Sequence, residues 1–320
     1  MRRATGAFLL PKGIQGWTTA ARLCYDNPKK GEITLQIIKH YRNDAALRRS
    51  FNELAEATFG LNFENWYQNG FWGDNYEPYS ILEDGKIVAN VSLNRTDMVI
   101  GGQRRRLYQL GTVMTAPEYR NRGYIRAIMK EVEEDMADAD GVYLFGNDNV
   151  VEFYPKFGFV PGKEHVYSRE VQLSGENTMT QVVMNCRENW DALANAMKAS
   201  TFPTGCHMVD NPGLIFFYAA QFMQECVYYS KKLDTWVIAE QEEEELLLHN
   251  VFTARNIALE DVIAAFGSGV KTVTLGFVPA DTTGWECREY YEEDCNFFIR
   301  GEGFRDFAEK KLRIPSLSHA

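Results

Sequence analysis

The chain is 320 residues long, 45% hydrophobic and 24% charged, with a formal net charge of −10 at pH 7. This length suits two domains with sizeable cores, and the composition is that of an ordinary soluble globular protein. The negative charge argues against a nucleic-acid-binding surface and is compatible with a cationic amine as ligand. The six cysteines show no CxxC pair and no tight spacing, so we expect no metal site, no disulfide framework and a reducing, cytoplasmic location.

Residues 1–31 differ in charge from the rest of the chain. They contain one acidic residue, Asp26, and six basic ones: Arg2, Arg3, Lys12, Arg22, Lys29 and Lys30. Their longest apolar run, residues 7–11, is too short for a signal peptide or a membrane span. A transit peptide is a weaker alternative because serine is absent. We therefore expect a disordered extension and no membrane association.

A first domain is expected over residues 32–173. Its first strand is predicted from four apolar residues: Ile33, Leu35, Ile37 and Ile38. Asn43 or Asp44 can cap a following helix, which Gly60 ends and whose apolar residues are Ala45, Leu47, Phe51, Leu54 and Phe59. Asp84-Gly85 and Gly101-Gly102 then predict two hairpins, so antiparallel strands should lead into the next part of the chain.

Seven aromatic residues lie between these helix and hairpin signals: Phe63, Trp66, Tyr67, Phe71, Trp72, Tyr76 and Tyr79. One interpretation is an aromatic wall that holds a protonated amine by cation–π contact. The other is a core-facing helix with a capping loop. The sequence alone leaves both open.

The segment that follows has the pattern of an anion-binding loop. Leu110 to Thr115 suit a strand, and Pro117 closes it. Arg120-Asn121-Arg122-Gly123 then leads into an amphipathic helix with Ile125, Ile128, Met129, Val132 and Met136 on one face. A helix N-terminus offers unpaired N–H groups, and a glycine lets the backbone approach a ligand. The expected ligand is therefore a phosphate or pyrophosphate. The alternative is an ordinary loop with solvated arginines.

A second pattern follows at the right separation. Residues 141–145 (GVYLF) suit a short buried strand, and Asn147, Val150, Tyr154, Gly158 and Phe159 come after it in fixed order. The two segments together resemble the GCN5-related N-acetyltransferase (GNAT) family, whose members use acetyl-coenzyme A. In that family a V-x(5–7)-[QR]-x-x-G-x-[GA] segment binds the pyrophosphate and an N…Y…GF segment follows. Arg120 and Gly123 match the first motif, and Ile125 stands where the family usually has Gly or Ala.

The resemblance implies a role for each matching residue. The backbone of Val113, Met114 and Thr115 would pair with the pantetheine arm, and Asn147 would hold that arm from the other side. The pyrophosphate would be bound by a loop of seven residues: Arg120, Asn121, Arg122, Gly123, Tyr124, Ile125 and Arg126. Tyr154 would be the general acid for the departing thiolate, because a phenol is protonated at neutral pH and can donate. The alternative for Tyr154 is a core tyrosine packed against Phe153 and Phe157.

A general base for the amine is harder to assign. Several family members place a glutamate on the strand before the loop, and Gln109 stands at that position here. An amide cannot accept the proton, so Asp97, Glu118 or a chain of water molecules remain as candidates.

After Gln172 the pattern restarts, and residues 178–320 are expected to form a second domain. Its predicted strands and helices follow the order of the first domain, but the corresponding loop, residues 253–258 (TARNIA), has no RxxG. We therefore predict a mixed α/β (α+β) fold, a GNAT-like mixed sheet flanked by helices and followed by a second, degenerate GNAT-like domain. This tandem order resembles the enhanced-intracellular-survival type of acetyltransferase without its third domain.

The end of the chain is predicted as a strand at residues 296–300, a turn, a helix from Phe304 to Leu312, and the sequence IPSLSHA. In the aminoglycoside-acetylating relatives the terminal carboxylate acts as the base, so the resemblance implies that role for Ala320, beside His319. A frayed tail is the alternative.

Two functions follow from these patterns. The first is an N-acetyltransferase that transfers the acetyl group of acetyl-coenzyme A to a primary amine, on a small molecule or a peptide, by direct attack. The second is a non-catalytic acyl-coenzyme A sensor, which Gln109 and Ile125 favour. Neither needs a metal or a nucleic acid, and a homo-oligomeric state stays open.

Overall fold

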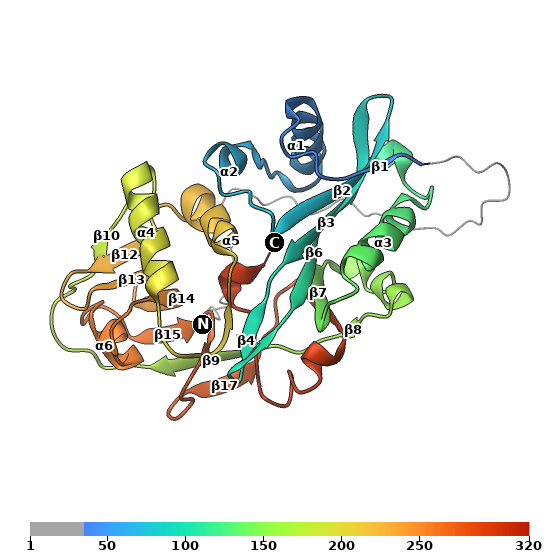
Figure 1. Cartoon of the computed structure of the whole chain (residues 1–320). Helices are drawn as coiled ribbons and strands as arrows, with labels where there is room; N and C mark the ends of the chain where they lie inside the picture. Colours follow the sequence, from blue (N-terminus) through green and yellow to red (C-terminus); the bar gives the residue numbers. More distant parts are fainter. Residues whose placement is uncertain (1–34, 320) are drawn as a thin grey trace.

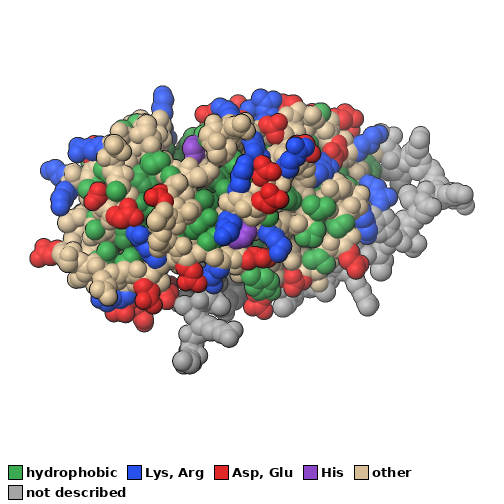
Figure 2. Space-filling view, turned by 90° about the horizontal axis from the view of Figure 1, so that it is seen from below, with side chains coloured by type: hydrophobic (Ala, Val, Ile, Leu, Met, Phe, Trp, Pro, Cys, Tyr) green, Lys and Arg blue, Asp and Glu red, His purple; other side chains and the backbone are tan. Residues whose placement is uncertain are grey.

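The computed structural model describes residues 35–319, so the predicted extension at residues 1–31 and the predicted base Ala320 lie outside the described residues. Two large sheets lie side by side in it, each with helices packed on it, and a smaller sheet crosses between them (Figure 1). In the described part, no helix is long and apolar enough to cross a membrane. Figure 2 shows acidic and basic side chains interspersed on the face seen from below.

The first large sheet has the strand order β1-β2-β3-β6-β7-β18-β8. These strands are β1 (Ile37–Ile38), β2 (Tyr76–Glu83), β3 (Lys86–Arg95), β6 (Leu107–Thr115), β7 (Gly141–Gly146), β8 (Val160–Pro161) and β18 (Asn296–Arg300). Neighbouring strands are antiparallel except for β6 and β7, which run parallel. The predicted mixed sheet is confirmed, as is the Asp84-Gly85 hairpin between β2 and β3.

Helices cover both faces of this sheet. Helix α1 (Ala45–Phe59) and the short α2 (Glu64–Gln68) pack on one face, and α3 (Tyr124–Asp135) packs on the other (Figure 1). The Asp44 carboxylate accepts the N–H groups of Ala46 and Leu47 at 2.9 and 3.1 Å, and Gly60 ends α1 with φ +68°. Both caps agree with the sequence pattern, because aspartate is a strong N-cap and glycine adopts positive φ without strain.

The second large sheet has the order β10-β12-β13-β14-β15-β9-β17. These strands are β9 (His165–Glu170), β10 (Thr180–Gln181), β12 (Val227–Ser230), β13 (Thr235–Glu242), β14 (Glu245–Phe252), β15 (Thr272–Leu275) and β17 (Glu286–Glu289). The helices of this half are α4 (Arg187–Ala199), α5 (Pro212–Phe217) and α6 (Leu259–Ala264). As in the first sheet, one pair is parallel, β14 with β15, and a helix connects its two strands.

The four-stranded sheet joins the two halves. Its order is β16-β11-β4-β5, with strands β4 (Met98–Ile100), β5 (Gln103–Arg105), β11 (Thr204–Met208) and β16 (Val278–Pro279). The hairpin predicted at Gly101-Gly102 is the β4–β5 turn. Because β4 pairs with β11, chain from both halves holds this sheet together.

Two strands cross the predicted domain limits of 32–173 and 178–320. Strand β18, near the end of the chain, lies between β7 and β8 in the first sheet, and β9, from the first half, lies between β15 and β17 in the second. Each sheet therefore needs chain from both predicted domains. The division into two domains stays a prediction. If it holds, β18 belongs to the first domain and β9 to the second.

The predicted helix from Phe304 to Leu312 is wrong. Those residues form a short 3₁₀ turn at 302–304 and then irregular turns, with φ +52° at Lys311. Phe304, Phe307 and Leu312 are all buried in the same core cluster. The chain has to turn at Lys311 to carry the following residues into the core, and that turn is incompatible with a helix.

Candidate active site

Strands β6 and β7 separate after three residue pairs. The pairs are Leu107 with Gly141, Tyr108 with Val142 and Gln109 with Tyr143, and no further pair joins these strands within residues 35–319. A bulge bends β6 at this point, where Thr112 has φ +41° and its carbonyl oxygen accepts a hydrogen bond from the Asn90 amide at 2.9 Å. The edge of β6 that faces β7 thus lacks a strand partner beyond Gln109.

The unpartnered part of β6 contains the three residues predicted to pair with an extended ligand arm. Val113 and Thr115 are partly buried, whereas the Met114 side chain is buried in the core on the side of α1. Met114 can therefore contribute only its backbone. An extended arm that carries amide groups could complete this edge as an added strand would.

The N-terminus of α3 follows directly. Gly123 caps the helix with φ +77°, and a Cβ at this position would meet no atom within 4 Å. The first helical bond joins the N–H of Ala127 to the Gly123 carbonyl at 3.0 Å, so the N–H groups of residues 124–126 have no acceptor inside the helix. An anion fits this end of the helix, since the backbone is open there and the helix dipole is positive.

Two arginine side chains bond back to the loop before α3. Nε of Arg120 donates to the Thr115 carbonyl at 3.2 Å, and Arg122 donates to the Glu118 carbonyl at 2.9 Å. One guanidinium nitrogen of Arg122 also lies 3.9 Å from the Glu83 carboxylate, at the end of β2. Nothing in the sequence pattern predicted Glu83 here, because the β2–β3 hairpin brings it to the loop from far along the chain.

Asn147 and Tyr154 lie just after β7, as the sequence motif predicts. The Asn147 side-chain oxygen accepts the N–H of Asn149 at 3.1 Å and so caps the turn that follows the strand. Tyr154 begins a second short turn (Tyr154–Phe157) and is 5% exposed, with its ring packed against Phe159 and Phe298. Burial raises the pKa of the Tyr154 phenol, so the hydroxyl stays protonated and can act only as a donor near neutral pH.

Gly146 makes room for this tyrosine. A Cβ on Gly146 would come within 3.0 Å of the Tyr154 ring and 2.9 Å of the Val150 side chain. A glycine at the end of β7 is therefore a packing requirement of the buried tyrosine. The sequence did not indicate a role for Gly146, because a glycine at the end of a strand is ordinarily just a turn signal.

Part of the chain is similar to a known family. Residues 44–162 match a family model described as an acetyltransferase (GNAT) domain. This part of the chain is similar to that family, and residues 44–162 are called the GNAT domain below. They contain both strands of the open pair, the loop before α3, Asn147 and Tyr154. No curated protein matches the chain by sequence.

Solved structures share the fold over most of the chain. A protein of Enterococcus faecalis V583, described as of unknown function and a probable N-acyltransferase, has a TM-score of 0.56 at 16% identity, covering 87% of this chain and 74% of its own. A GCN5-related N-acetyltransferase from Kribbella flavida has a TM-score of 0.52 at 17% identity, covering 86% and 74%. Eis1 from Mycobacterium abscessus matches with a TM-score of 0.49 at 12% identity, covering 82% of this chain and 73% of its own.

The carboxylates considered as bases are poorly suited to that role. Asp97 is buried, but hydrogen bonds from Arg95 (2.8 and 3.1 Å) and Arg104 (2.7 Å) outweigh the effect of burial and hold its pKa below the ordinary value. Asp97 is therefore the centre of an ion cluster and a weak base. Glu118 is exposed on the loop, and Gln109 is buried on β6.

The end of the described chain lies beside the GNAT domain. The His319 ring stacks on Phe145 of β7 with centroids 3.9 Å apart, and the His319 carbonyl accepts the Tyr218 hydroxyl at 2.7 Å. The Tyr143 hydroxyl donates to the Ser318 carbonyl at 2.8 Å. A frayed tail is thus wrong for residues up to 319, which are held between the two halves (Figure 1). The role of Ala320 as base stays a prediction.

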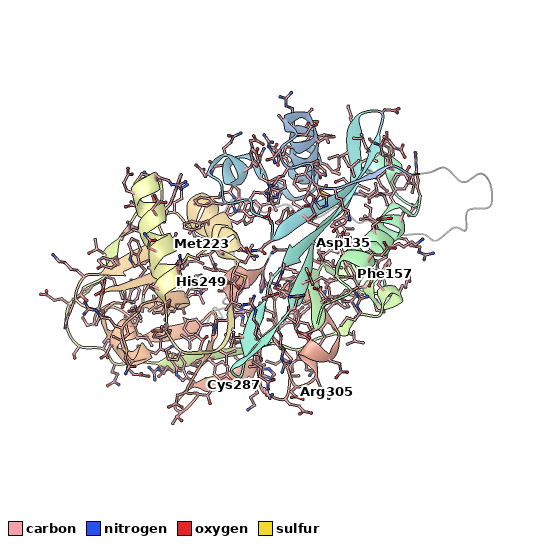
Figure 3. The ribbon with its side chains drawn as sticks, viewed as in Figure 1. Asp135, Phe157, Met223, His249, Cys287 and Arg305 are labelled. Carbon is pink, nitrogen blue, oxygen red and sulfur yellow. The ribbon has the colours of Figure 1, made fainter. Side chains whose placement is uncertain are left out.

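The segment near Ser316 also lies beside the second sheet, at the point where β14 and β15 stop pairing. Those strands pair only from Glu245 to Leu248, and the N–H of Ser316 donates to the Gly276 carbonyl at 2.8 Å just beyond. The Ser316 hydroxyl lies 2.7 Å from Nδ1 of His249, which Figure 3 marks near the centre of the molecule. The gap between β6 and β7 in the GNAT domain is unfilled within the described residues. The corresponding gap between β14 and β15 in the second sheet is filled by residues near Ser316.

The aromatic residues between α1 and β2 do not form an open wall. Phe63, Trp66, Trp72 and Tyr76 are buried against one another and against Phe217 of α5, with ring centroids 5.3 to 6.2 Å apart. The core interpretation of this segment is confirmed for these four residues. Their density in the sequence reflects a core shared by the two halves.

One buried carboxyl group was not predicted at all. Glu164, between β8 and β9, is 4% exposed, and its Oε1 accepts the N–H of Ile314 at 2.8 Å. Burial raises the pKa of Glu164 from 4.5 to about 7, although Arg313 and the Ile314 N–H act in the opposite direction. The charge of Glu292 also raises the pKa of Glu164, and Glu164 in turn raises the pKa of four neighbouring groups: Tyr290, Cys295, Cys206 and Tyr143.

This shift predicts a pH-dependent stability. The folded state favours the protonated acid, so its contribution is present below pH 4.5 and is lost as the pH rises through about 7. At higher pH the buried carboxylate costs on the order of 3 kcal/mol. We expect Glu164→Gln to unfold at a higher temperature than wild type at pH 8.5 and at a similar temperature at pH 5. Thermal unfolding across this range measures the difference, and a pH-independent offset would contradict the assignment.

Proposed function

We propose that the protein is an N-acetyltransferase that uses acetyl-coenzyme A and a primary amine. The observation that carries this proposal is the separation of β6 from β7 beside the Gly123-capped end of α3. The unpartnered edge suits an amide-bearing arm, and the helix end with Arg120, Arg122 and Arg126 suits a pyrophosphate. Cytoplasmic location and the absence of nucleic-acid partners remain expectations from composition.

The proposed reaction is a direct transfer. Acetyl-coenzyme A supplies an activated acyl carbon, and the amine nitrogen forms the new C–N bond as the C–S bond breaks. Tyr154 would give its phenolic proton to the departing sulfur, and a base would remove the extra proton from the nitrogen. Tyr154 is suited to its part because burial keeps it protonated and packing fixes its ring. The base would be the carboxylate of Ala320 or a water molecule.

A non-catalytic acyl-coenzyme A sensor is the second candidate. The observation that favours it is Gln109 at the position where several family members carry a base, together with the ion-paired state of Asp97. Such a protein would keep the coenzyme site and lack turnover.

The test is an assay of free thiol released from acetyl-coenzyme A in the presence of a panel of primary amines, compared with their N-methylated tertiary counterparts. We expect release with at least one primary amine and none with the matched tertiary amine, because only the former gives a stable amide. Coenzyme binding without release for any amine or peptide would support the sensor and reject the transferase.

A further inference from the structure

A cavity of about 200 Å³ lies at the end of β7. It is lined by the carboxyl end of β7, the connection from β8 to β9 and the segment that leads into β18. Phe145, Pro161 and Phe297 form apolar walls, and Glu164 and Glu292 bring carboxyl groups to it. None of residues 120–126, the loop before α3 and its first turn, lines this cavity.

The charges around the cavity are not balanced. Within residues 35–319, no hydrogen bond or ion pair to Oε2 of Glu164 is found, although the side chain is 4% exposed and borders the cavity. Glu292 is partly buried, and burial raises its pKa as well. Among residues 35–319, Arg313 is the one cation whose charge lowers the pKa of both groups. Two carboxyl groups thus share one guanidinium, and a second cation would stabilise both in their charged form.

The rim of the cavity carries an exposed aromatic and an exposed aliphatic side chain, which can contact the carbon chain of a ligand. Tyr291 is 81% exposed and Val151 is 39% exposed, and both line the cavity. A large aromatic side chain left in water beside two carboxyl groups is an arrangement that recognises organic cations. Lys163 also lies at the rim, but it is 3.0 Å from Glu289 and so is paired with that carboxylate.

The cavity is close to the predicted chemistry. Phe298, one of its lining residues, has its ring centroid 5.5 Å from that of Tyr154. Phe145, another lining residue, stacks on His319, the residue before the predicted base Ala320. Phe145 and Phe298 face opposite sides of the sheet, so the cavity lies at the end of β7 where residues from both sides meet.

We propose that this cavity binds the amine acceptor as an alkylammonium cation, with Glu164 and Glu292 as its counter-charges and Tyr291 over its carbon chain. This inference rests on the proposed transferase function, since it names the acceptor site of that reaction. A single ammonium group is expected, because one cation would stabilise the charged forms of both carboxyl groups.

The binding step can be tested without turnover. The probe is n-butylammonium, with n-butanol as a neutral ligand of similar shape, titrated by ligand-observed NMR in the presence of coenzyme A, which has no acetyl group to transfer. We expect the ammonium to bind and the alcohol to bind at least tenfold more weakly, a difference of about 1.4 kcal/mol. Equal binding of the two, or no binding of the ammonium, would overturn the proposal.

Substitutions at the exposed rim avoid the risk that a core variant fails to fold. Val151→Arg adds a positive charge and should weaken n-butylammonium binding about tenfold, whereas Val151→Glu should strengthen it. Glu292→Gln should weaken it, and Glu286→Gln, an exposed change on β17 outside the cavity, should leave it unaltered. Equal affinity in the two Val151 variants would also overturn the proposal.

Turnover then separates this inference from the proposed function. If the wild type releases thiol with amines and Val151→Arg has the same KM for the amine, the acceptor site lies elsewhere while the transferase function stands. If n-butylammonium binds as expected but no amine is acetylated, the transferase function fails and the cavity is not an acceptor site. A raised KM with little change in kcat in Val151→Arg would support both.

Discussion

The Gly123→Glu variant should bind acetyl-coenzyme A at least about 100-fold more weakly than wild type. The glutamate would place a negative charge at the positive end of α3, where the pyrophosphate is expected, and it would occupy the space that is open beside Gly123. The measurement is the rise in unfolding temperature with coenzyme concentration, since a ligand of the folded state stabilises it as its concentration passes the dissociation constant.

A matched control separates charge from backbone strain. Gly102, in the β4–β5 turn, has φ +78° and, like Gly123, no atom within 4 Å of a built Cβ. Gly102→Glu should therefore have a similar cost in stability and keep the coenzyme-induced shift. A shift that persists in Gly123→Glu would place the coenzyme away from the N-terminus of α3, and loss in both variants would mean that strain alone explains the effect.

The Tyr154→Phe variant should lower kcat by about 100-fold while the coenzyme affinity stays the same. Within residues 35–319, no hydrogen bond to the Tyr154 hydroxyl is found, and its ring contacts do not involve that group. Removing the oxygen should therefore leave the fold intact and remove only the proton for the departing thiolate. Steady-state kinetics measures the fall in kcat, and the coenzyme-induced thermal shift on the same preparation measures the coenzyme affinity.

Tyr79→Phe is the control for the loss of a buried tyrosine hydroxyl. Tyr79 lies on β2 of the same sheet, and its hydroxyl donates to Asp135 at the end of α3 at 2.6 Å; Figure 3 marks Asp135. This change should reduce stability slightly and leave kcat near the wild-type value. If Tyr154→Phe also kept the wild-type kcat, Tyr154 would be a core residue and another group would serve as the acid.

Local signals in the sequence predicted the parts of the site that depend on neighbouring residues. Asp44 and Gly60 cap α1, and Gly123 caps α3, because caps depend on a few residues of backbone geometry. The order of Asn147 and Tyr154 after β7 is likewise a local pattern. The anion loop and the motif after β7 could therefore be placed to within a residue or two.

What the sequence could not predict depends on contacts between distant segments. Glu83 reaches the loop before α3 through a hairpin. Burial raises the pKa of Glu164, and the groups that oppose this shift, Arg313 and the Ile314 N–H, lie about 150 residues further on. The aromatic residues from Phe63 to Tyr76 were ambiguous because their partner, Phe217, lies in the other half. Pairing of β18 with β7 also has no local signature, since a short apolar strand can join any edge.

The position of β18 has a consequence for how the protein is made. Strand β7 has β18 as its antiparallel neighbour, from Gly146 paired with Asn296 to Val142 paired with Arg300. During synthesis the chain emerges from its N-terminal end, so the whole GNAT domain leaves the ribosome before residues 296–300 exist. Until they arrive, the edge of β7 next to Tyr154 has no partner strand and is open to pairing with other chains. The sheet around the candidate active site can thus be completed only after residues 296–300 have been translated.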